Sequence, residues 1–338
     1  MSKTPNEAGF RQPGEWTPHR ACWLAFPSDP ELWPTLDEAQ ASFVTMCRAI
    51  AEPGRELPAE KLQVLVSDAA AETSARHLLG ELPARFHQIA FGDIWMRDIA
   101  PVFLKRGDGK VGSVRFRFNG WGGKYSYPGD SEVAEQVQTL MPLERFASPL
   151  CLEGGAVESD GKGLCLTTRD VALNQNRNAG LTQGDVEKLL RDALGAERTI
   201  WLTRGLLNDH TDGHIDNIAR FIGENCVVCA RPSGSDDPNA EVLGEIEREL
   251  RAAGLTVETI PSPGVVLGRD GAPLPASYLN FYIANGALVV PVFGTEHDDA
   301  GLKALEGLFS DRPARPVPAK VFLQEGGTVH CISQQEPL

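Results

Sequence analysis

The segment EGGTV at residues 325–329 nearly repeats the segment EGGAV at residues 153–157. A related segment, DGHID at residues 212–216, lies between them and again places glycine after an acid. Three helix-like segments begin near residues 182, 239 and 299, at intervals of 57 and 60 residues, and about three such intervals separate the two EGG segments. Regular spacing of this kind is typical of stacked or radial modules. The sequence therefore predicts a ring of β-rich modules, each carrying a helix and directing a loop or strand end to a shared centre.

Short apolar segments alternate with amphipathic ones, which indicates an α/β fold. The predicted strands are residues 21–26, 62–67, 111–118, 163–168, 226–230, 281–293 and 321–324. The predicted helices are residues 131–141, 182–195, 239–254 and 299–309. Thr182 is the expected cap of the second helix and Gly195 its expected end. No linker or low-complexity segment interrupts residues 1–338, so we expect one domain.

The composition excludes several classes of protein. The chain has 338 residues, with 46 acidic and 32 basic side chains and a net charge of −14. This charge disfavours nucleic acid as a partner and favours small cationic ligands. No run of 18 apolar residues predicts a membrane span. We see no secretion leader and no regular framework among the seven cysteines, so we expect a cytoplasmic protein.

The His-Cys pair at residues 330–331 is a candidate for nucleophilic chemistry. Gly326 and Gly327 precede it and allow a backbone to approach a ligand closely. A nucleophilic cysteine needs a base or a cation nearby to become a thiolate. On a strand, His330 and Cys331 would point to opposite faces, so we expect the base to come from elsewhere. The alternative is that Cys331 is a buried structural thiol.

The segment NDHTDGHIDN at residues 208–217 is the densest cluster of ionisable side chains. His210, Asp212, His214 and Asp216 alternate, so on an extended segment all four would project from one face. Metal binding is one interpretation, because His and Asp are suitable ligands for Zn or Mn. Acid/base catalysis by His214, with an Asp holding a cationic substrate, is the second. A solvated polar loop is the third.

Two further acids stand next to apolar segments. Asp98 follows Trp95 and Arg97 at the start of an apolar run. It either forms a surface ion pair with a neighbouring charge or is a buried carboxylate that receives a cationic group beside an aromatic wall. Glu153 follows Leu152 and precedes two glycines. It is either an exposed turn acid or the partner of another buried polar group.

Taken together, these elements resemble the agmatine deiminase and bacterial peptidyl-arginine deiminase family of the guanidino-group-modifying superfamily. The similar segments, in chain order, are PGEWTPHRACWLAFPSDPELW, WMRDIAPVF, FNGWGGKY, LEGGAV, LTTRDVALNQNRN, DGHIDNIARF, SYLNFYIANGALVVPVFG and GGTVHCISQQEP. They cover nearly the whole chain. The resemblance implies an α/β fold, the five-bladed α/β propeller with pseudo-fivefold symmetry called the pentein fold. It also implies that residues 1–338 form a single catalytic domain.

The resemblance implies a role for each matching residue. Cys331 is similar to the nucleophile, His214 to the general acid/base, and Glu153 to the acid that positions the histidine or closes the guanidinium site. Asp98 and Asp216 match the two carboxylates that grip the guanidinium. The residues expected to bind the substrate are Trp95, Asp98, Trp121, Asp216 and Gly327. No metal or organic cofactor is implied.

The reaction implied by the resemblance is hydrolysis of agmatine to N-carbamoylputrescine and ammonia through a covalent thiouronium, a step of putrescine and polyamine biosynthesis. The chain has Thr211-Asp212-Gly213 where the family typically has Thr-Asn-Gly, and Glu325 to Thr328 where three glycines and Asn are usual. The extra charge of Asp212 favours a dication such as agmatine. Arginine, peptidyl-arginine or another guanidino compound is the alternative substrate. A metal-dependent amidohydrolase, a non-enzymatic guanidine-binding protein and a homodimer stay open.

Overall fold

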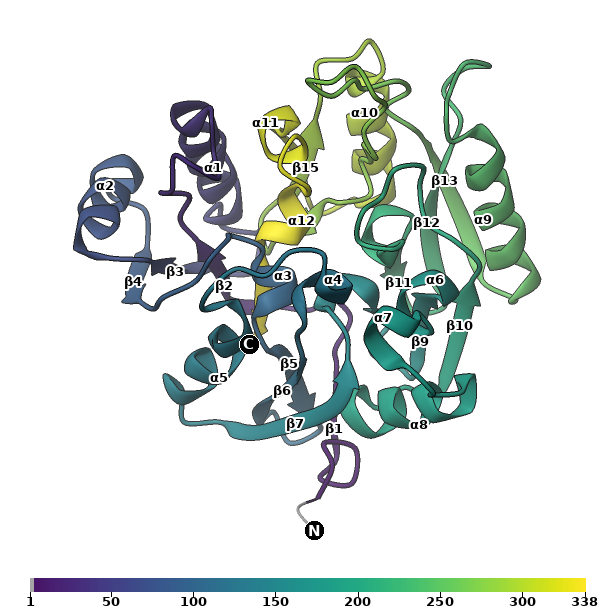
Figure 1. Cartoon of the computed structure of the whole chain (residues 1–338), viewed down its shortest axis with the longest axis horizontal. Coiled ribbons are helices and arrows are strands. Elements are labelled where there is room, and N and C mark those ends of the chain that lie inside the picture. The colour runs from purple at the N-terminus through teal and green to yellow at the C-terminus, as the bar shows by residue number, and fades with distance from the viewer. Residues whose placement is uncertain (1–2) are drawn as a thin grey trace.

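Five small sheets surround a common centre in the computed structural model, which describes residues 3–338 (Figure 1). In each sheet an antiparallel pair of strands is followed, through a helical connection, by a third strand that pairs in parallel. Helices in these connections lie on the outside of the ring (Figure 1). The predicted five-bladed α/β propeller is therefore confirmed.

Four blades follow one another along the chain. The first contains β1 (Phe10–Arg11), β5 (Val102–Arg106), β6 (Val111–Arg117), α5 (Asp130–Thr139) and β7 (Glu144–Cys151). The second contains β8 (Glu158–Ser159), β9 (Leu164–Thr168), α8 (Gln183–Leu194) and β10 (Arg198–Leu202). The third contains β11 (Ala219–Gly223), β12 (Cys226–Arg231), α9 (Ala240–Ala252) and β13 (Thr256–Pro261). The fourth contains β14 (Tyr282–Ile283), β15 (Leu288–Val292), α10 (Asp298–Leu308) and β16 (Ala314–Pro318).

The fifth blade is assembled from both ends of the chain. It contains β17 (Gln334–Pro337), β2 (His19–Ala25), α1 (Leu36–Ile50), β3 (Lys61–Val66), α2 (Ala69–Leu79) and β4 (Ala84–Gln88). β17 pairs antiparallel with β2, with Gln334 opposite Trp23. The indole of Trp23 also donates a hydrogen bond of 3.1 Å to Glu336 Oε2. The last residues of the chain thus close the ring, and this closure holds the nearby Cys331 in place.

Deleting residues 334–338 should lower the free energy of unfolding by at least about 3 kcal/mol, because it removes a buried strand and leaves the partners of that strand unpaired. Deleting Leu338 alone is the matched control, since its side chain is exposed. Denaturant unfolding of both variants measures the difference. Equal stability of the two truncated chains would show that β17 does not close the ring.

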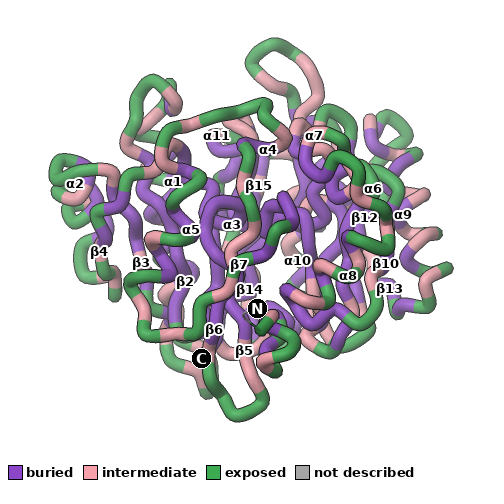
Figure 2. The backbone as a smooth tube through the Cα atoms, turned by 60° about the horizontal axis from the view of Figure 1, so that its bottom comes forward, coloured by how far each residue is buried: buried purple, intermediate pink, exposed green. Residues whose placement is uncertain are grey.

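The sequence accounts for the outer helices. Thr182 and Asp185 form a capping box at the start of α8, and Gly195 ends the helix with a φ of 73°. Both predicted limits of this helix are confirmed. The apolar face predicted for α9 is buried, and the exposed residues lie mainly at the periphery of the ring, whereas its interior is buried (Figure 2). The helices predicted at 131–141 and 299–309 are observed as α5 and α10.

Two predicted strands are wrong. Residues 321–323 lie in a short helix that ends before Gln324, because a four-residue apolar run does not by itself distinguish a strand from one buried helical turn. Residues 281–293 form two strands, since Asn285-Gly286 turns the chain back between β14 and β15. The remaining short helices are α3 (Met96–Ile99), α4 (Gly120–Gly123), η1 (Gly154–Ala156), α6 (Arg169–Ala172), α7 (Gln175–Asn178), η2 (Ile215–Asn217), α11 (Lys320–Leu323) and α12 (Val329–Ile332).

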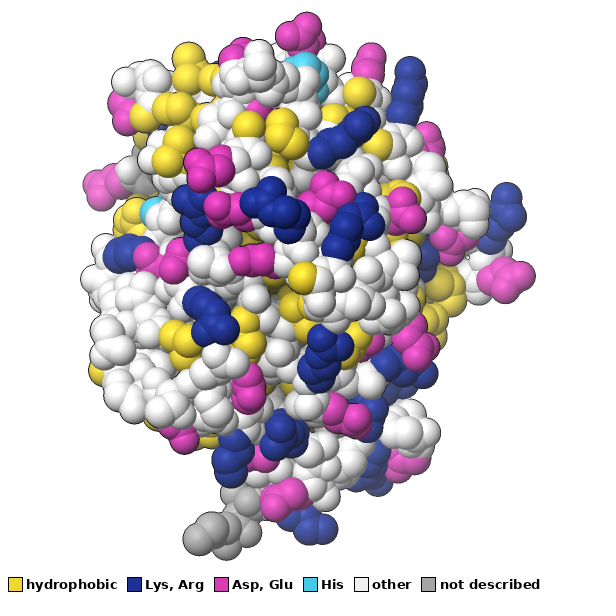
Figure 3. Space-filling model, turned by 90° about the vertical axis from the view of Figure 1, so that its right-hand side faces the viewer, with side chains coloured by type: hydrophobic (Ala, Val, Ile, Leu, Met, Phe, Trp, Pro, Cys, Tyr) yellow, Lys and Arg dark blue, Asp and Glu magenta, His cyan; other side chains and the backbone are white. Residues whose placement is uncertain are grey.

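The surface carries both signs of charge in close mixture. On the face drawn in Figure 3, basic and acidic side chains lie side by side over the outer elements. Within residues 3–338, no helix has the length and apolar character needed to cross a membrane.

Candidate active site

Each blade sends a short turn to the centre of the ring, immediately before its first inner strand. The turns that precede β5, β8, β11 and β17 are α3, η1, η2 and α12, and neighbouring turns contact one another. They carry Asp98, Glu153, His214 with Asp216, and Cys331. The turn before β14 carries Asn280. The shared centre predicted from the repeats is therefore present.

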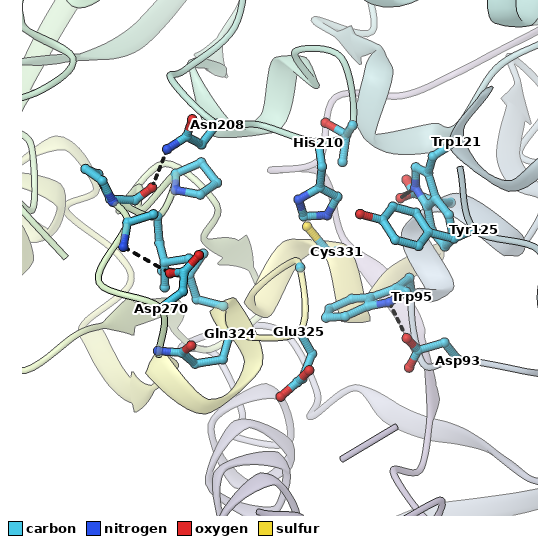
Figure 4. Close-up of a pocket in the computed structure, with 18 of the residues that line it drawn as sticks. Asp93, Trp95, Trp121, Tyr125, Asn208, His210, Asp270, Gln324, Glu325 and Cys331 are labelled. Atoms are coloured by element: carbon cyan, nitrogen blue, oxygen red, sulfur yellow. Dashed lines mark hydrogen bonds between the residues drawn. The ribbon is translucent and has the colours of Figure 1, made fainter. Parts of the chain in front are cut away.

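A cavity of about 570 Å³ leads from the surface to Cys331. Trp95, Trp121, Tyr125 and His210 surround the thiol in the close-up of Figure 4. The other lining residues are Asp93, Asp98, Tyr127, Asn208, Thr211, Asp270, Ala272, Pro273, Leu274, Pro275, Leu323, Gln324, Glu325 and Gly326. Four of the lining side chains are acids, and none of those described is Lys or Arg. The cavity is therefore suited to a cation.

Asp98 is buried at the inner end of the cavity. Its Oδ2 accepts a hydrogen bond of 2.8 Å from Trp121 Nε1, and its Oδ1 accepts one of 3.0 Å from the backbone N–H of Gly155. Burial raises the pKa of Asp98 to about 6, although the charge of His214 opposes this rise. The neighbouring Arg97 does not pair with it and instead donates to Gln334 and Gln335 in β17. Asp98 is thus a buried carboxylate rather than a surface ion pair.

His214 lies between two carboxylates. Its Nε2 is 3.4 Å from Glu153 Oε2, and its Nδ1 is 3.8 Å from Asp98 Oδ1. Burial alone would lower the pKa of His214, but the charges of Asp98, Glu153 and Asp216 raise it to about 9. The imidazole is therefore protonated at neutral pH.

Glu153 is completely buried and is held from behind. Both of its carboxylate oxygens accept hydrogen bonds from Arg177 Nε, at 3.0 and 2.9 Å. Burial raises its pKa, but the bond to His214 and the charge of Arg177 outweigh this and lower it. Gly155 stands beside this group, and a Cβ there would lie 2.7 Å from His214 Nδ1. Any larger residue would displace the histidine.

Asp216 has one oxygen engaged and one without a partner. Its Oδ2 lies 2.8 Å from His330 Nδ1, and the other ring nitrogen of His330 lies 2.8 Å from Glu15 Oε2. Burial raises the pKa of Asp216, but His330 outweighs this and lowers it. Oδ1 is buried and has no hydrogen-bond partner among the described residues. A donor from a ligand would satisfy that oxygen.

Cys331 is buried in α12, and its Sγ lies 4.0 Å from Asp216 Oδ2. Burial, together with the negative charges of Asp216 and Asp98, raises the pKa of this thiol well above its usual value. The resting site therefore holds a neutral thiol and a protonated imidazole.

Comparison with known proteins agrees with this arrangement. The profile of the Porphyromonas-type peptidyl-arginine deiminases matches residues 11–337. This chain belongs to that family. It is 33% identical to the agmatine deiminase of Stutzerimonas stutzeri, over 100% of this chain and 98% of the relative.

Solved structures of the family superpose along nearly the whole length. The agmatine deiminase of Enterococcus faecalis gives a TM-score of 0.92 at 28% identity and covers 100% of this chain and 98% of that chain. A cysteine-to-serine variant of the C. jejuni agmatine deiminase with substrate bound gives 0.86 at 26% identity, covering 97% and 96%. The family assignment made from the motifs is confirmed.

The predicted substrate-binding residues Trp95, Trp121 and Gly327 lie together in this family member. Trp95 and Trp121 both line the cavity. Trp95 Nε1 donates a hydrogen bond of 2.7 Å to Asp93, which fixes the indole plane. A Cβ on Gly327 would lie 2.7 Å from Trp95 and 2.9 Å from the Cβ of Cys331. Glycine is thus needed where the indole packs against the cysteine turn.

The extended arrangement expected for residues 208–217 is wrong. Asp212 and Gly213 have φ values of 67° and 86°, so the side chains do not alternate on one face. The Asp212 carboxylate turns away to Lys124 Nζ at 2.5 Å and Arg177 Nη1 at 2.6 Å. The charge of Asp212 is therefore neutralised. The sequence-based prediction that this charge favours a dication is wrong.

The same turn separates the four residues proposed as metal ligands. Asp212 is bound by two cationic side chains, whereas His210 faces the cavity. Among residues 3–338, no group of three or more His, Cys, Asp or Glu side chains is arranged to hold a metal ion.

Three contributors to the site were not expected from the sequence. Residues 329–332 form a helical turn rather than a strand, so the facing argument made for His330 is wrong. His330 contacts Asp216 and Glu15 instead of standing apart from the site. Arg177 and Asn280 were also missed. The segment SYLNFY does have the family pattern, and its place before a strand is the signal that would have identified Asn280.

Proposed function

We propose that this protein is a cysteine-dependent deiminase that hydrolyses agmatine to N-carbamoylputrescine and ammonia. The observation that carries the proposal is the convergence of a thiol, a protonated histidine and two buried carboxylates at the end of a cavity lined by acids. The relatives named as agmatine deiminases support it. So does the C. jejuni enzyme, whose cysteine-to-serine variant was obtained with substrate bound.

The two carboxylates fit a planar cation with several N–H donors. Asp98 and Asp216 can accept from a guanidinium, and the unpartnered Oδ1 of Asp216 gains a donor in this way. The bound positive charge also stabilises the thiolate of Cys331, which the resting site disfavours. Binding of the substrate and ionisation of the thiol are thus coupled, with the thiol proton passing to solvent.

The chemical steps then need only this chain's side chains and water. The thiolate attacks the guanidinium carbon, and the new C–S bond gives a neutral tetrahedral adduct. His214 protonates the departing amine, ammonia leaves, and a cationic thiouronium remains on Cys331. Neutral His214 then takes a proton from water as the oxygen adds. Collapse of the second adduct returns the electron pair to sulfur and releases the ureido product and one proton.

Agmatine is favoured over arginine by the charge of the cavity. Glu325 lines the cavity but is paired with Arg269 at 2.6 Å, and the carboxylate of Asp93 is buried and accepts from Trp95. Asp270 lines the cavity at its rim, and the described lining holds no Lys or Arg that could pair with a carboxylate. The distal amine of agmatine meets attraction there, whereas the carboxylate of arginine meets repulsion. Because the site draws on all five blades, we also propose that the whole chain acts as one catalytic domain. We propose that this reaction serves the synthesis of putrescine in the cytoplasm.

Ammonia release from agmatine, arginine and a peptidyl-arginine at equal concentrations tests the proposal. Agmatine should have a kcat/KM at least about 100-fold above that of arginine, since a charge reversal at the distal group costs several kcal/mol. Turnover of peptidyl-arginine with agmatine inert would overturn the choice of substrate. Inertness of all three compounds would overturn the proposed reaction.

The dependence of kcat/KM on pH follows from the two titrating groups. The reactive form is the thiolate with imidazolium, which has one proton fewer than the resting site below pH 9. We therefore expect kcat/KM to rise by about tenfold per pH unit from pH 7 to about 9. It should level off above the His214 pKa of about 9. There the resting site has lost the His214 proton and holds as many protons as the reactive form, so the fraction of enzyme in the reactive form no longer changes with pH. Below about pH 6 the slope should steepen, because Asp98 then takes up a proton.

Steady-state rates in buffers of constant ionic strength measure this profile. A flat or falling kcat/KM between pH 7 and 9 would contradict a resting site with thiol and imidazolium.

A further inference from the structure

Asn280 touches the reactive sulfur and is completely buried. Its Nδ2 lies 3.3 Å from Cys331 Sγ, and its Oδ1 lies 3.4 Å from the same atom. It comes from the turn before β14, so it is the contribution of the fourth blade to the centre. The catalytic roles above use the other four blades and leave this residue without one.

The orientation of the Asn280 amide is decided by its neighbours. Oδ1 lies 2.5 Å from Thr328 Oγ1, 3.0 Å from the backbone N of His330 and 3.4 Å from the backbone N of Cys331. The two backbone groups can only donate, so the oxygen must face them. The Nδ2–H₂ group then faces the sulfur. Exchange of the amide oxygen and nitrogen would place donors against donors.

This orientation gives the amide a different contact with each state of the sulfur. The S–H of the thiol can donate to Oδ1. The thiolate has no proton to donate and can only accept, and Nδ2–H is the donor within reach of it. Two carboxylates disfavour the thiolate, because the negative charges of Asp216 and Asp98 both oppose a negative charge on Cys331. A fixed N–H donor beside the sulfur acts in the opposite direction.

We propose that Asn280 is a catalytic residue of the deiminase reaction proposed above, in which its Nδ2–H donates a hydrogen bond to the thiolate of Cys331. It acts when the thiolate forms for attack on the guanidinium carbon. It acts again when the second adduct collapses and the C–S electron pair returns to sulfur. Asn280 itself neither gains nor loses a proton. Thr328 is the positioning residue, because its hydroxyl holds Oδ1 and thereby aims Nδ2 at the sulfur.

Two pairs of variants test the proposal. Asn280→Asp keeps the shape and replaces the N–H donor with an oxygen, and Asn280→Ala removes the amide. Thr328→Val removes the hydroxyl at nearly constant volume, and Thr328→Ser returns it. We expect kcat to fall by about 100-fold or more in both Asn280 variants, as for the loss of one donor to a developing anion. We expect a loss of about tenfold in Thr328→Val that Thr328→Ser largely restores.

The decisive readout is the rate of Cys331 alkylation by iodoacetamide as a function of pH, measured without substrate. This rate follows the thiolate fraction. Peptide mass spectrometry assigns the alkylated cysteine, and a Cys331→Ser chain measures reaction at the half-buried Cys226. The Asn280 variants and Thr328→Val should react at least about tenfold more slowly at pH 9, with KM for agmatine nearly unchanged. A purely structural role would move KM and stability but not the thiolate fraction.

The outcomes separate this inference from the proposed reaction. Wild-type alkylation profiles in folded Asn280→Asp and Thr328→Val chains would overturn the role of Asn280, even if agmatine is turned over. Slower alkylation in the variants than in the wild type would support the thiolate contact. If the wild-type chain also releases no ammonia from any guanidino compound, the thiolate contact is retained and the proposed reaction is rejected. If the Asn280 variants do not fold, the Thr328→Val and Thr328→Ser pair decides by the same measurement.

Discussion

Replacing Cys331 with Ser should reduce ammonia release from agmatine by at least about 10⁴-fold and leave the fold intact, because the nucleophile is lost at nearly constant volume. A serine hydroxyl ionises far less readily than a thiol, and the acids around residue 331 oppose a negative charge there. The described cysteines are all free, so no disulfide is broken. Agmatine should still bind, since Asp98 and Asp216 are unchanged. Ammonia assays measure turnover, and calorimetric titration measures binding.

Cys226→Ser is the matched control for this replacement. Cys226 is also a free thiol, but it lies in β12, away from the cavity, and is only about half buried. Its substitution should change kcat/KM by less than about twofold, as expected for a side chain outside the reacting centre. Ureido product accumulating at the wild-type rate with Cys331→Ser would show that another group is the nucleophile.

The sequence predicted the repeating architecture because its signals are local. Thr182 with Gly195 fixes the limits of α8, and the apolar positions of α9 are read directly from the 3.6-residue period. Local signals failed where they were short or overridden. The run at 321–324 is too short to show a period, and it forms one turn of helix. β17 pairs with β2, which lies more than 300 residues away in the chain. No local pattern predicts such a partner.

The candidate site divides in the same way. Asp98, Glu153, His214 and Cys331 lie in motifs that can be recognised as strings of residues. The groups that tune them come from distant segments: Arg177 against Glu153, and Glu15 against His330. Asp212 illustrates the cost of a purely local argument. Its alternation with His214 suggested a shared face, but a left-handed backbone and an ion pair with Arg177 turn it away. Such tertiary pairing is not encoded in the spacing of one segment.

Asp98→Asn should lower kcat/KM for agmatine by about 100- to 10,000-fold. The carboxylate would make charge-assisted hydrogen bonds to the guanidinium, and each such bond contributes about 1.5–3 kcal/mol. Asn has the same shape but only one terminal oxygen, so one of the two donors to Asp98, Trp121 Nε1 or the Gly155 N–H, loses its acceptor. The matched control is Asp270→Asn, because Asp270 also lines the cavity but its carboxylate is bonded to the backbone N–H of Ala272 at the rim. That variant should lose less than about tenfold.

The same variant has a second signature, which a general loss of packing would not produce. Asp98 is the foremost of the charges that raise the pKa of His214. Without that charge the imidazolium is less stable, so its pKa must fall. The pH at which kcat/KM levels off should therefore move below about 9, and the steeper slope below about pH 6 should vanish because the group that titrates there is gone. A pH profile of Asp98→Asn with both features of the wild type would mean that Asp98 contacts neither His214 nor the substrate cation in the working enzyme.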